Sequence, residues 1–149
     1  MNQDSLFEQE EVTIVVTDSG LGGISITADV AERLKRSRIF RSARIIFFNS
    51  SFDNKSGYNV ISDHQEKIRI FNNALNSMAS RYQPDLILIG CNTLSVLYPE
   101  TPFSTATTIP VTGIVETGVE QILLNWQKTN NADIFLFGTQ TTISGSSHK

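Results

Sequence analysis

Short apolar runs, each bounded by polar or glycine-containing segments, recur along the chain. Runs of about four to eight residues rich in Val, Ile, Leu and Phe are typical of buried strands in a parallel sheet. The clearest is Leu86-Ile87-Leu88-Ile89, which lies between Pro84 and Gly90 and leads into Cys91. The pattern predicts strands at Val12–Val16, Ala43–Phe48, Asp85–Ile89, Ile109–Ile114 and Asp133–Phe137.

Between these runs, apolar residues recur at helical spacing. One predicted helix follows the first strand, a second opens with a capping box at Ser62 and Gln65, and a third opens with a capping box at Thr117 and Glu120. Their predicted buried faces are Ile24, Ala28, Ala31 and Leu34; Ile68, Phe71, Leu75 and Met78; and Val119, Ile122, Leu123 and Trp126.

Strands that alternate with helices predict an α/β fold with a doubly wound parallel sheet. Right-handed crossovers place all strand carboxyl ends at one edge, which is where ligands bind in such sheets. That edge is expected to collect Asp18, Ser19, the polar loop 49–59, Cys91, Asn92, Thr93 and Glu116.

Composition restricts the class of protein further. The chain has 149 residues, 40% of them hydrophobic, which predicts one globular domain of ordinary size. A net charge of −3 without a concentrated basic face argues against a nucleic-acid partner. No apolar run approaches the roughly 20 residues that span a bilayer, and residues 1–11 lack the apolar region of a signal peptide. These features predict a cytoplasmic protein with no membrane partner.

Cys91 is the only cysteine, so an internal disulfide is excluded. Its position at the end of a strand and the start of a helix suits a thiolate that acts as base or nucleophile. The alternative is a small cysteine that only packs. Because neither His64 nor His148 has metal-ligand spacing to Cys91, no metal site is expected.

Asp18 ends the first strand and precedes the glycine-rich turn 20–23. Its carboxylate suits an ammonium group or a nearby thiol, and the alternative is a helix cap. The turn does not match the dinucleotide fingerprint, since Ser25 stands where a third glycine is required, and no P-loop motif is present. Neither a dinucleotide site nor a P-loop nucleotide site is therefore expected.

Several segments resemble glutamate racemases in motif and order. Residues 18–23 are similar to the D-S-G-x-G-G opening of that family, and residues 91–93 to its C-N-T motif. Residues 109–116 resemble the I-P-V-x-G-x-x-E segment, and residues 138–145 the G-T-x-x-T-x-x-S-G segment. Tyr58 and Ser62 match the Y-G-x-x-S loop, with Asn59 in place of its glycine.

The resemblance implies an isomerase that interconverts L- and D-glutamate without a cofactor and supplies D-glutamate to peptidoglycan synthesis. One cysteine removes the Cα proton, and a second returns a proton on the opposite face. Cys91 matches the first of these, and Asp18 and Ser19 would lie beside it and the substrate ammonium. Tyr58, Asn92 and Thr93 would contact the substrate.

The same resemblance predicts how the chain is divided. Residues 1–11 form a flexible tail, 12–115 a first α/β lobe, and 116–149 a connecting helix and the start of a second lobe that is largely missing. The second cysteine is absent, so the chain alone is expected to be inactive as a racemase. The alternatives are a non-catalytic module that binds an amino acid or another chain, and a related aspartate racemase. Exposure of Trp126, Phe135 and Phe137 would favour a homo-oligomer.

Overall fold

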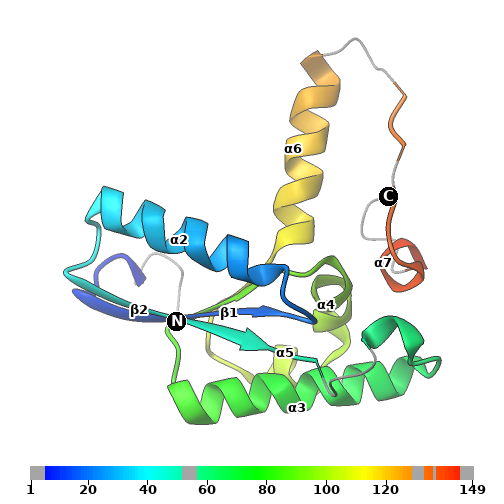
Figure 1. Ribbon diagram of the computed structural model, residues 1–149, viewed down its shortest axis with the longest axis horizontal. Coiled ribbons are helices and arrows are strands. Elements are labelled where there is room, and N and C mark those ends of the chain that lie inside the picture. The colour runs from blue at the N-terminus through cyan, green and yellow to red at the C-terminus, as the bar shows by residue number, and fades with distance from the viewer. Residues whose placement is uncertain (1–5, 52–56, 129–132, 136, 145–149) are drawn as a thin grey trace.

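The computed structural model describes residues 6–51, 57–128, 133–135 and 137–144. Four parallel strands form the sheet of this part of the chain: β1 (Glu11–Asp18), β2 (Ser42–Asn49), β3 (Leu86–Ile89) and β4 (Val111–Gly113). Their order is β2-β1-β3-β4, which places the first strand in the interior of the sheet. The predicted α/β class and parallel sheet are confirmed (Figure 1).

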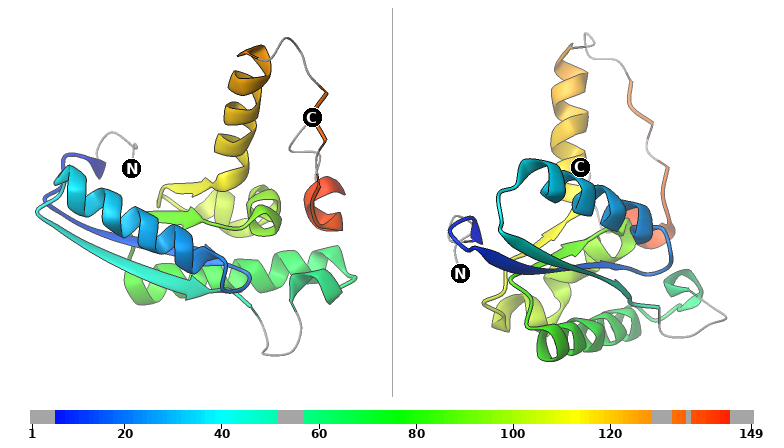
Figure 2. Two further views of the ribbon diagram at one scale, coloured as in Figure 1. Left: turned by 45° about the horizontal axis from the view of Figure 1, so that its top comes forward. Right: turned by 60° about the vertical axis from the view of Figure 1, so that its left-hand side comes forward.

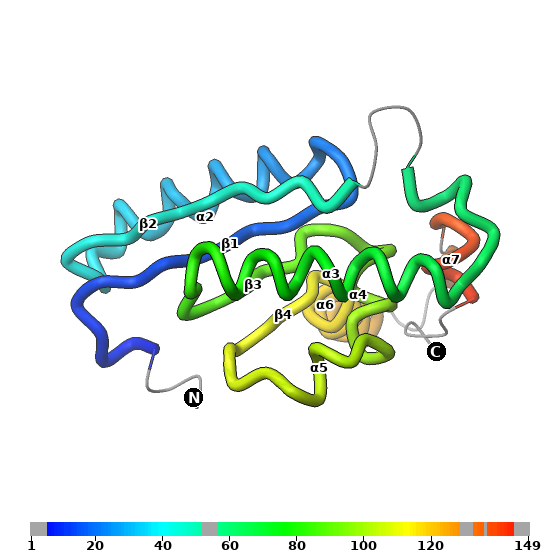
Figure 3. Tube along the Cα trace, turned by 90° about the horizontal axis from the view of Figure 1, so that it is seen from below, coloured from blue at the N-terminus to red at the C-terminus, as the bar shows by residue number. Residues whose placement is uncertain are grey.

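Helices cover both faces of the sheet. Helix α2 (Gly23–Ser37) lies on one face and α3 (His64–Tyr82) on the other, as Figures 1 and 3 show. The core on the α3 side centres on Val15, Phe71, Leu75, Met78 and Ile87. A smaller core of Leu6, Val12, Ile14 and Val16 lies on the α2 side. Alternate residues of β1 are thus buried in opposite cores. For this reason the sequence of the strand is a nearly continuous apolar run.

Short helical segments follow the strand ends. They are the 3₁₀ helix η1 (Tyr58–Val60), α4 (Asn92–Leu97), the 3₁₀ helix η2 (Tyr98–Glu100), α5 (Pro102–Ala106) and α7 (Gln140–Ser144). Figure 2 shows α7 beside α4 and the start of α3, although α7 lies far along the chain from both. This return brings residues 138–144 to the carboxyl edge of the sheet.

Helix α6 (Ile114–Lys128) projects away from the sheet (Figures 1 and 2). Its predicted buried face is wrong, because Leu123 is 50% exposed and Trp126 is 36% exposed. The predicted capping box at Thr117 is also wrong, since α6 begins at Ile114 and Thr117 lies inside it. Apolar residues at helical spacing require a partner surface to be buried, and the described residues supply none along most of this helix.

The predicted strand 133–137 is not formed by its described residues, 133–135 and 137, which have no regular secondary structure. Phe135 is 81% exposed and Phe137 is 91% exposed. Leu136 lies outside the described residues. An apolar alternation can form a strand only beside a partner strand, and β4 pairs only with β3 in this part of the chain.

The start of α3 differs by one residue from the prediction. Asp63 is the N-cap, and its carboxylate accepts a hydrogen bond from the backbone N–H of Gln65 at 2.9 Å. The capping box predicted at Ser62 is therefore wrong, while the helix itself and its apolar stripe are confirmed.

Part of the predicted flexible tail packs against the sheet. Leu6 is buried in the smaller core, and the ring of Phe7 stacks on Phe40 with centroids 6.2 Å apart. No helix among the described residues is long and apolar enough to cross a bilayer.

Candidate functional site

The register of the sheet brings the predicted site residues to one edge. Asp18 pairs with Asn49 across β1 and β2. The backbone N–H of Ser50 donates to the Asp18 carbonyl at 2.7 Å, and that of Gly90 donates to the Thr17 carbonyl at 2.8 Å. The carboxyl ends of β1, β2 and β3 are thus aligned. Cys91 is the residue directly after Gly90, at the end of β3.

Cys91 is the N-cap of α4, with extended backbone dihedrals (φ −136°, ψ 126°). Its side chain is partly buried against the main core, and its Sγ lies 3.2 Å from the Oγ of Ser19. A hydroxyl at this distance can donate to a thiolate. Since α4 has only six residues, its dipole is small, and Ser19 is the more specific partner of the thiol.

Asp18 is held in place by the glycine-rich turn that follows it. The Asp18 side chain is almost fully buried. A Cβ at Gly23 would lie 2.8 Å from the Asp18 Cβ and 2.9 Å from Cε2 of Phe47, and one at Gly22 would lie 3.0 Å from an Asp18 carboxylate oxygen. These glycines are therefore required for the backbone to close over the carboxylate.

Tyr58 lies in the core beneath the same edge. Its hydroxyl donates to the Ser50 carbonyl at 3.0 Å, and the Ser50 hydroxyl lies 2.6 Å from that of Thr17. Burial, and then the negative charge that Cys91 carries as a thiolate, raise the pKa of Tyr58 above its usual range. The phenol is therefore neutral at physiological pH. The proton of the Tyr58 hydroxyl is used in the hydrogen bond to the Ser50 carbonyl. A contact between Tyr58 and the substrate therefore stays a prediction.

Three threonine hydroxyls join the C-N-T segment to α7. The Thr93 Oγ1 lies 3.1 Å from that of Thr139, which lies 3.0 Å from that of Thr142. Thr93 and Thr142 are buried, whereas Asn92 is exposed. Thr139 and Thr142 were not predicted as site residues, although the motif that contains them was noted.

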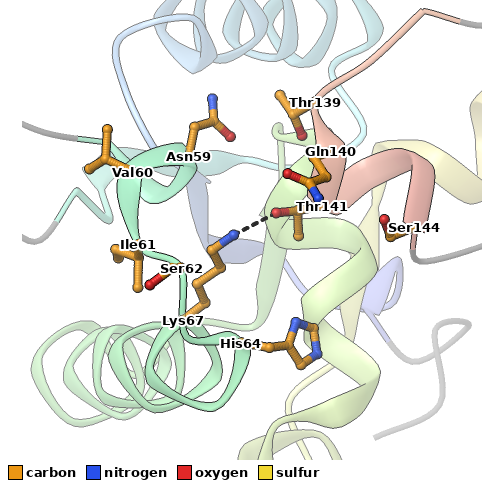
Figure 4. A pocket seen from close by; sticks show the side chains of 10 residues that line it. All are labelled: Asn59, Val60, Ile61, Ser62, His64, Lys67, Thr139, Gln140, Thr141 and Ser144. Atoms are coloured by element: carbon orange, nitrogen blue, oxygen red, sulfur yellow. Dashed lines mark hydrogen bonds between the residues drawn. The ribbon is translucent and has the colours of Figure 1, made fainter.

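A cavity of about 520 Å³ lies between the start of α3, the η1 segment and α7 (Figure 4). Lys67 enters it from α3, and its Nζ donates to the Thr141 Oγ1 at 2.8 Å. His64 lines the same cavity, is about half exposed and pairs with Glu100 at 2.9 Å. No sequence pattern indicates Lys67 as a site residue, because a lysine on an amphipathic helix is usually solvated.

The site therefore brings Asp18, Ser19, Tyr58, Cys91 and Thr93 to one edge and adds a lysine cavity beside it. Among the described residues, no group of three or more His, Cys, Asp or Glu side chains could hold a metal ion. A thiol with a hydroxyl partner and a neighbouring carboxylate, at the carboxyl edge of a parallel sheet, is an arrangement suited to proton transfer on a small polar molecule.

Over most of its length the chain is similar to glutamate racemases. The chain is 33% identical over 135 residues to the glutamate racemase of Chlorobaculum tepidum, which covers 91% of this chain and 45% of that protein. It is 27% identical over 138 residues to that of Chlorobium phaeobacteroides, covering 93% of this chain and 46% of that protein. The crystal structure of glutamate racemase from Campylobacter jejuni matches 91% of this chain and 50% of its own chain, with a TM-score of 0.69 and 28% identity.

These similarities confirm the resemblance to glutamate racemases that the motifs predicted, and they confirm the fold. The chain spans about half the length of the relatives it matches. No protein-family model matches the chain.

Proposed function

We propose that this chain binds glutamate at the carboxyl edge of its sheet and that Cys91 transfers a proton to and from the amino acid Cα. The observation that carries the proposal is the 3.2 Å approach of Ser19 Oγ to Cys91 Sγ at the strand edge that also holds Asp18. The similarity to glutamate racemases supports the choice of amino acid and of reaction class. In the complete reaction, with a second proton donor on the opposite face, the D-glutamate formed would supply peptidoglycan synthesis.

The roles of the residues follow from their chemistry. The Cys91 thiolate takes the Cα proton and becomes a thiol, and the electron pair of the C–H bond remains on the substrate. Ser19 stabilises the thiolate before the transfer through a hydrogen bond to sulfur. Asp18 pairs with the substrate ammonium, and Asn92 and Thr93 offer donors to its carboxylate. Preorganised donors are required because the carbanion-like state concentrates charge on the substrate.

Inversion at Cα requires proton donors on both faces of the substrate, whereas the sequence contains one cysteine. A single thiol returns a proton to the face from which it came. We therefore expect this chain alone to exchange the Cα hydrogen of L-glutamate with solvent while retaining its configuration, and to form negligible D-glutamate.

The test is incubation of L-glutamate with the pure chain in D2O. Proton NMR measures loss of the Cα–H signal, and circular dichroism measures racemisation. We expect deuterium uptake that requires Cys91, so a Cys91→Ala variant should show only the uncatalysed rate. Equal exchange by the Cys91→Ala variant would refute the role of the thiol.

A binding module without catalysis is the second candidate, and the single cysteine is the observation that favours it. Calorimetry separates the two functions: saturable heat with L-glutamate in the absence of any Cα exchange identifies a binding module. The same titration with L-aspartate tests the alternative amino acid.

A further inference from the structure

The cavity beside the strand edge contains a buried cation. Lys67 retains only 9% of its exposed surface, and its side chain points between Asn59 and Thr141 in Figure 4. Among the described residues, its side-chain ammonium donates one hydrogen bond, to the Thr141 hydroxyl. An ammonium has further N–H donors beyond the one used in this bond. Those donors face a cavity of about 520 Å³.

The surroundings of this ammonium do not neutralise it. Within the described ranges, Lys67 forms no ion pair, and the residues that line the cavity include no Asp or Glu. The Glu100 carboxylate pairs instead with His64. Removing a charge from water without an opposite charge is unfavourable, so a buried ammonium in this position favours an anion as its partner.

The other polar groups of the cavity fit an anion. The cavity is lined by residues with hydroxyl or amide donors: Asn59, Ser62, Thr139, Gln140, Thr141 and Ser144. Thr139 also bonds to Thr93, the second residue after Cys91. The cavity and the thiol site therefore share one wall while differing in the residues that form them.

We propose that Lys67 and Thr141 form a carboxylate-binding subsite. Two sources could supply the carboxylate. One is the side chain of an amino acid whose Cα lies at Cys91, which rests on the proposed function. The other is a separate small dicarboxylate. In either case, an N⁺–H···O⁻ bond from Lys67 anchors the ligand, and Thr141 directs the ammonium toward it.

The test is NMR titration of the isotope-labelled 149-residue chain with glutarate, which carries carboxylates but no amino group. We expect saturable shifts of the Thr141 amide and of the Lys67 Cε signal, while the other lysines stay unchanged. The Lys67→Gln variant should bind roughly tenfold or more weakly. Arg69→Gln removes the same charge from an exposed position two residues further along α3 and should bind as the parent chain does.

If Lys67→Gln fails to fold, the Lys67 Cε signal of the unaltered chain still measures whether glutarate binds beside Lys67. Absence of a glutarate response at Lys67, or equal responses at all lysines, overturns the proposal. L-glutamate and L-glutamine then separate the two sources. If glutamate shifts Thr141 and glutamine does not, the substrate side chain occupies the subsite; if only glutarate shifts it, a separate ligand does. Failure of Cα exchange at Cys91 would leave the glutarate result intact.

Discussion

At the scale of single residues, the candidate site depends on buried polar groups that support one another. Tyr58 is the clearest case, because its phenol is buried near Cys91 and donates to the Ser50 carbonyl. Burial disfavours the phenolate, and the coulombic effect of a thiolate at Cys91 disfavours it further. The hydroxyl thereby holds the chain that follows β2 against the edge of the sheet.

This arrangement predicts a dependence of stability on alkaline pH. The unfolded tyrosine has a pKa of about 10, and the folded pKa is higher, so the folded state holds this proton more tightly. The contribution of Tyr58 is fully present below pH ~10 and is lost as pH rises from there toward the folded pKa. Urea unfolding should show Tyr58→Phe less stable by about 1 kcal/mol at pH 8, with the difference shrinking above pH ~10. A difference that stays constant with pH would contradict this account.

Gly23 determines where Asp18 lies. An added methyl would come within 2.8 Å of the Asp18 Cβ, so Gly23→Ala should destabilise the chain by about 1–3 kcal/mol and displace the carboxylate. Gly118 of α6 is the matched control, since a Cβ there meets nothing within 4 Å. Gly118→Ala should stabilise the helix by up to ~1 kcal/mol. Thermal unfolding measures the stability of both variants. Equal changes in stability would contradict the claim that Gly23 is required for close packing against Asp18.

Sequence reasoning located the strand-end residues but not the cavity. Asp18, Ser19 and Cys91 were predicted to share an edge because parallel strands end together, and the structure confirms that edge; their catalytic roles remain predictions. Lys67 was not predicted as a site residue. It is buried because α7, which lies far along the chain, packs beside the start of α3. The packing of distant segments against each other is not visible in a local pattern.

At the scale of elements, the boundaries of α3 show how capping chemistry decides a helix start. Both Ser62 and Asp63 suit an N-cap, and the structure uses Asp63. Asp63→Ala should therefore cost about 1 kcal/mol in the free energy of unfolding, and Ser62→Ala should have little effect. Denaturant titration of the two variants distinguishes them. A larger loss for Ser62→Ala would restore the capping box predicted from the sequence.

Strands β1 and β3 and helix α3 could be predicted because each has a period that matches its burial. The buried face predicted for α2 is wrong in part, since Ile24 is 49% exposed and Ala28 is also exposed. The strand predicted at 133–137 and the buried face predicted for α6 were wrong for a common reason. Both segments have an apolar pattern, which shows only that burial would be favourable. Burial also requires a partner surface, and a local pattern does not show whether the fold supplies that surface. Leu123, Trp126 and Phe135 are accordingly exposed.

At the scale of the whole molecule, most of the exposed large apolar side chains lie in the C-terminal third. They include Leu123, Leu124, Trp126, Ile134, Phe135, Phe137 and Ile143. Apolar surface of this extent favours association with another polypeptide. We expect the chain to self-associate as its concentration rises, and a Leu124→Ser/Phe135→Ser double variant to do so less.

Sedimentation velocity over a range of concentrations measures this association. The control is Leu21→Ser, which removes an exposed apolar side chain from the opposite end of the chain and should leave association unchanged. Monomeric behaviour at every concentration would contradict the prediction of a homo-oligomer.

The central claim is that the carboxyl edge of the sheet is an amino-acid site with Cys91 at its centre. The most direct measurement is the rate at which iodoacetamide alkylates Cys91, followed by mass spectrometry, as L-glutamate is added. The account predicts a saturable slowing by L-glutamate that Asp18→Asn weakens. An alkylation rate that is unchanged at saturating L-glutamate would contradict it.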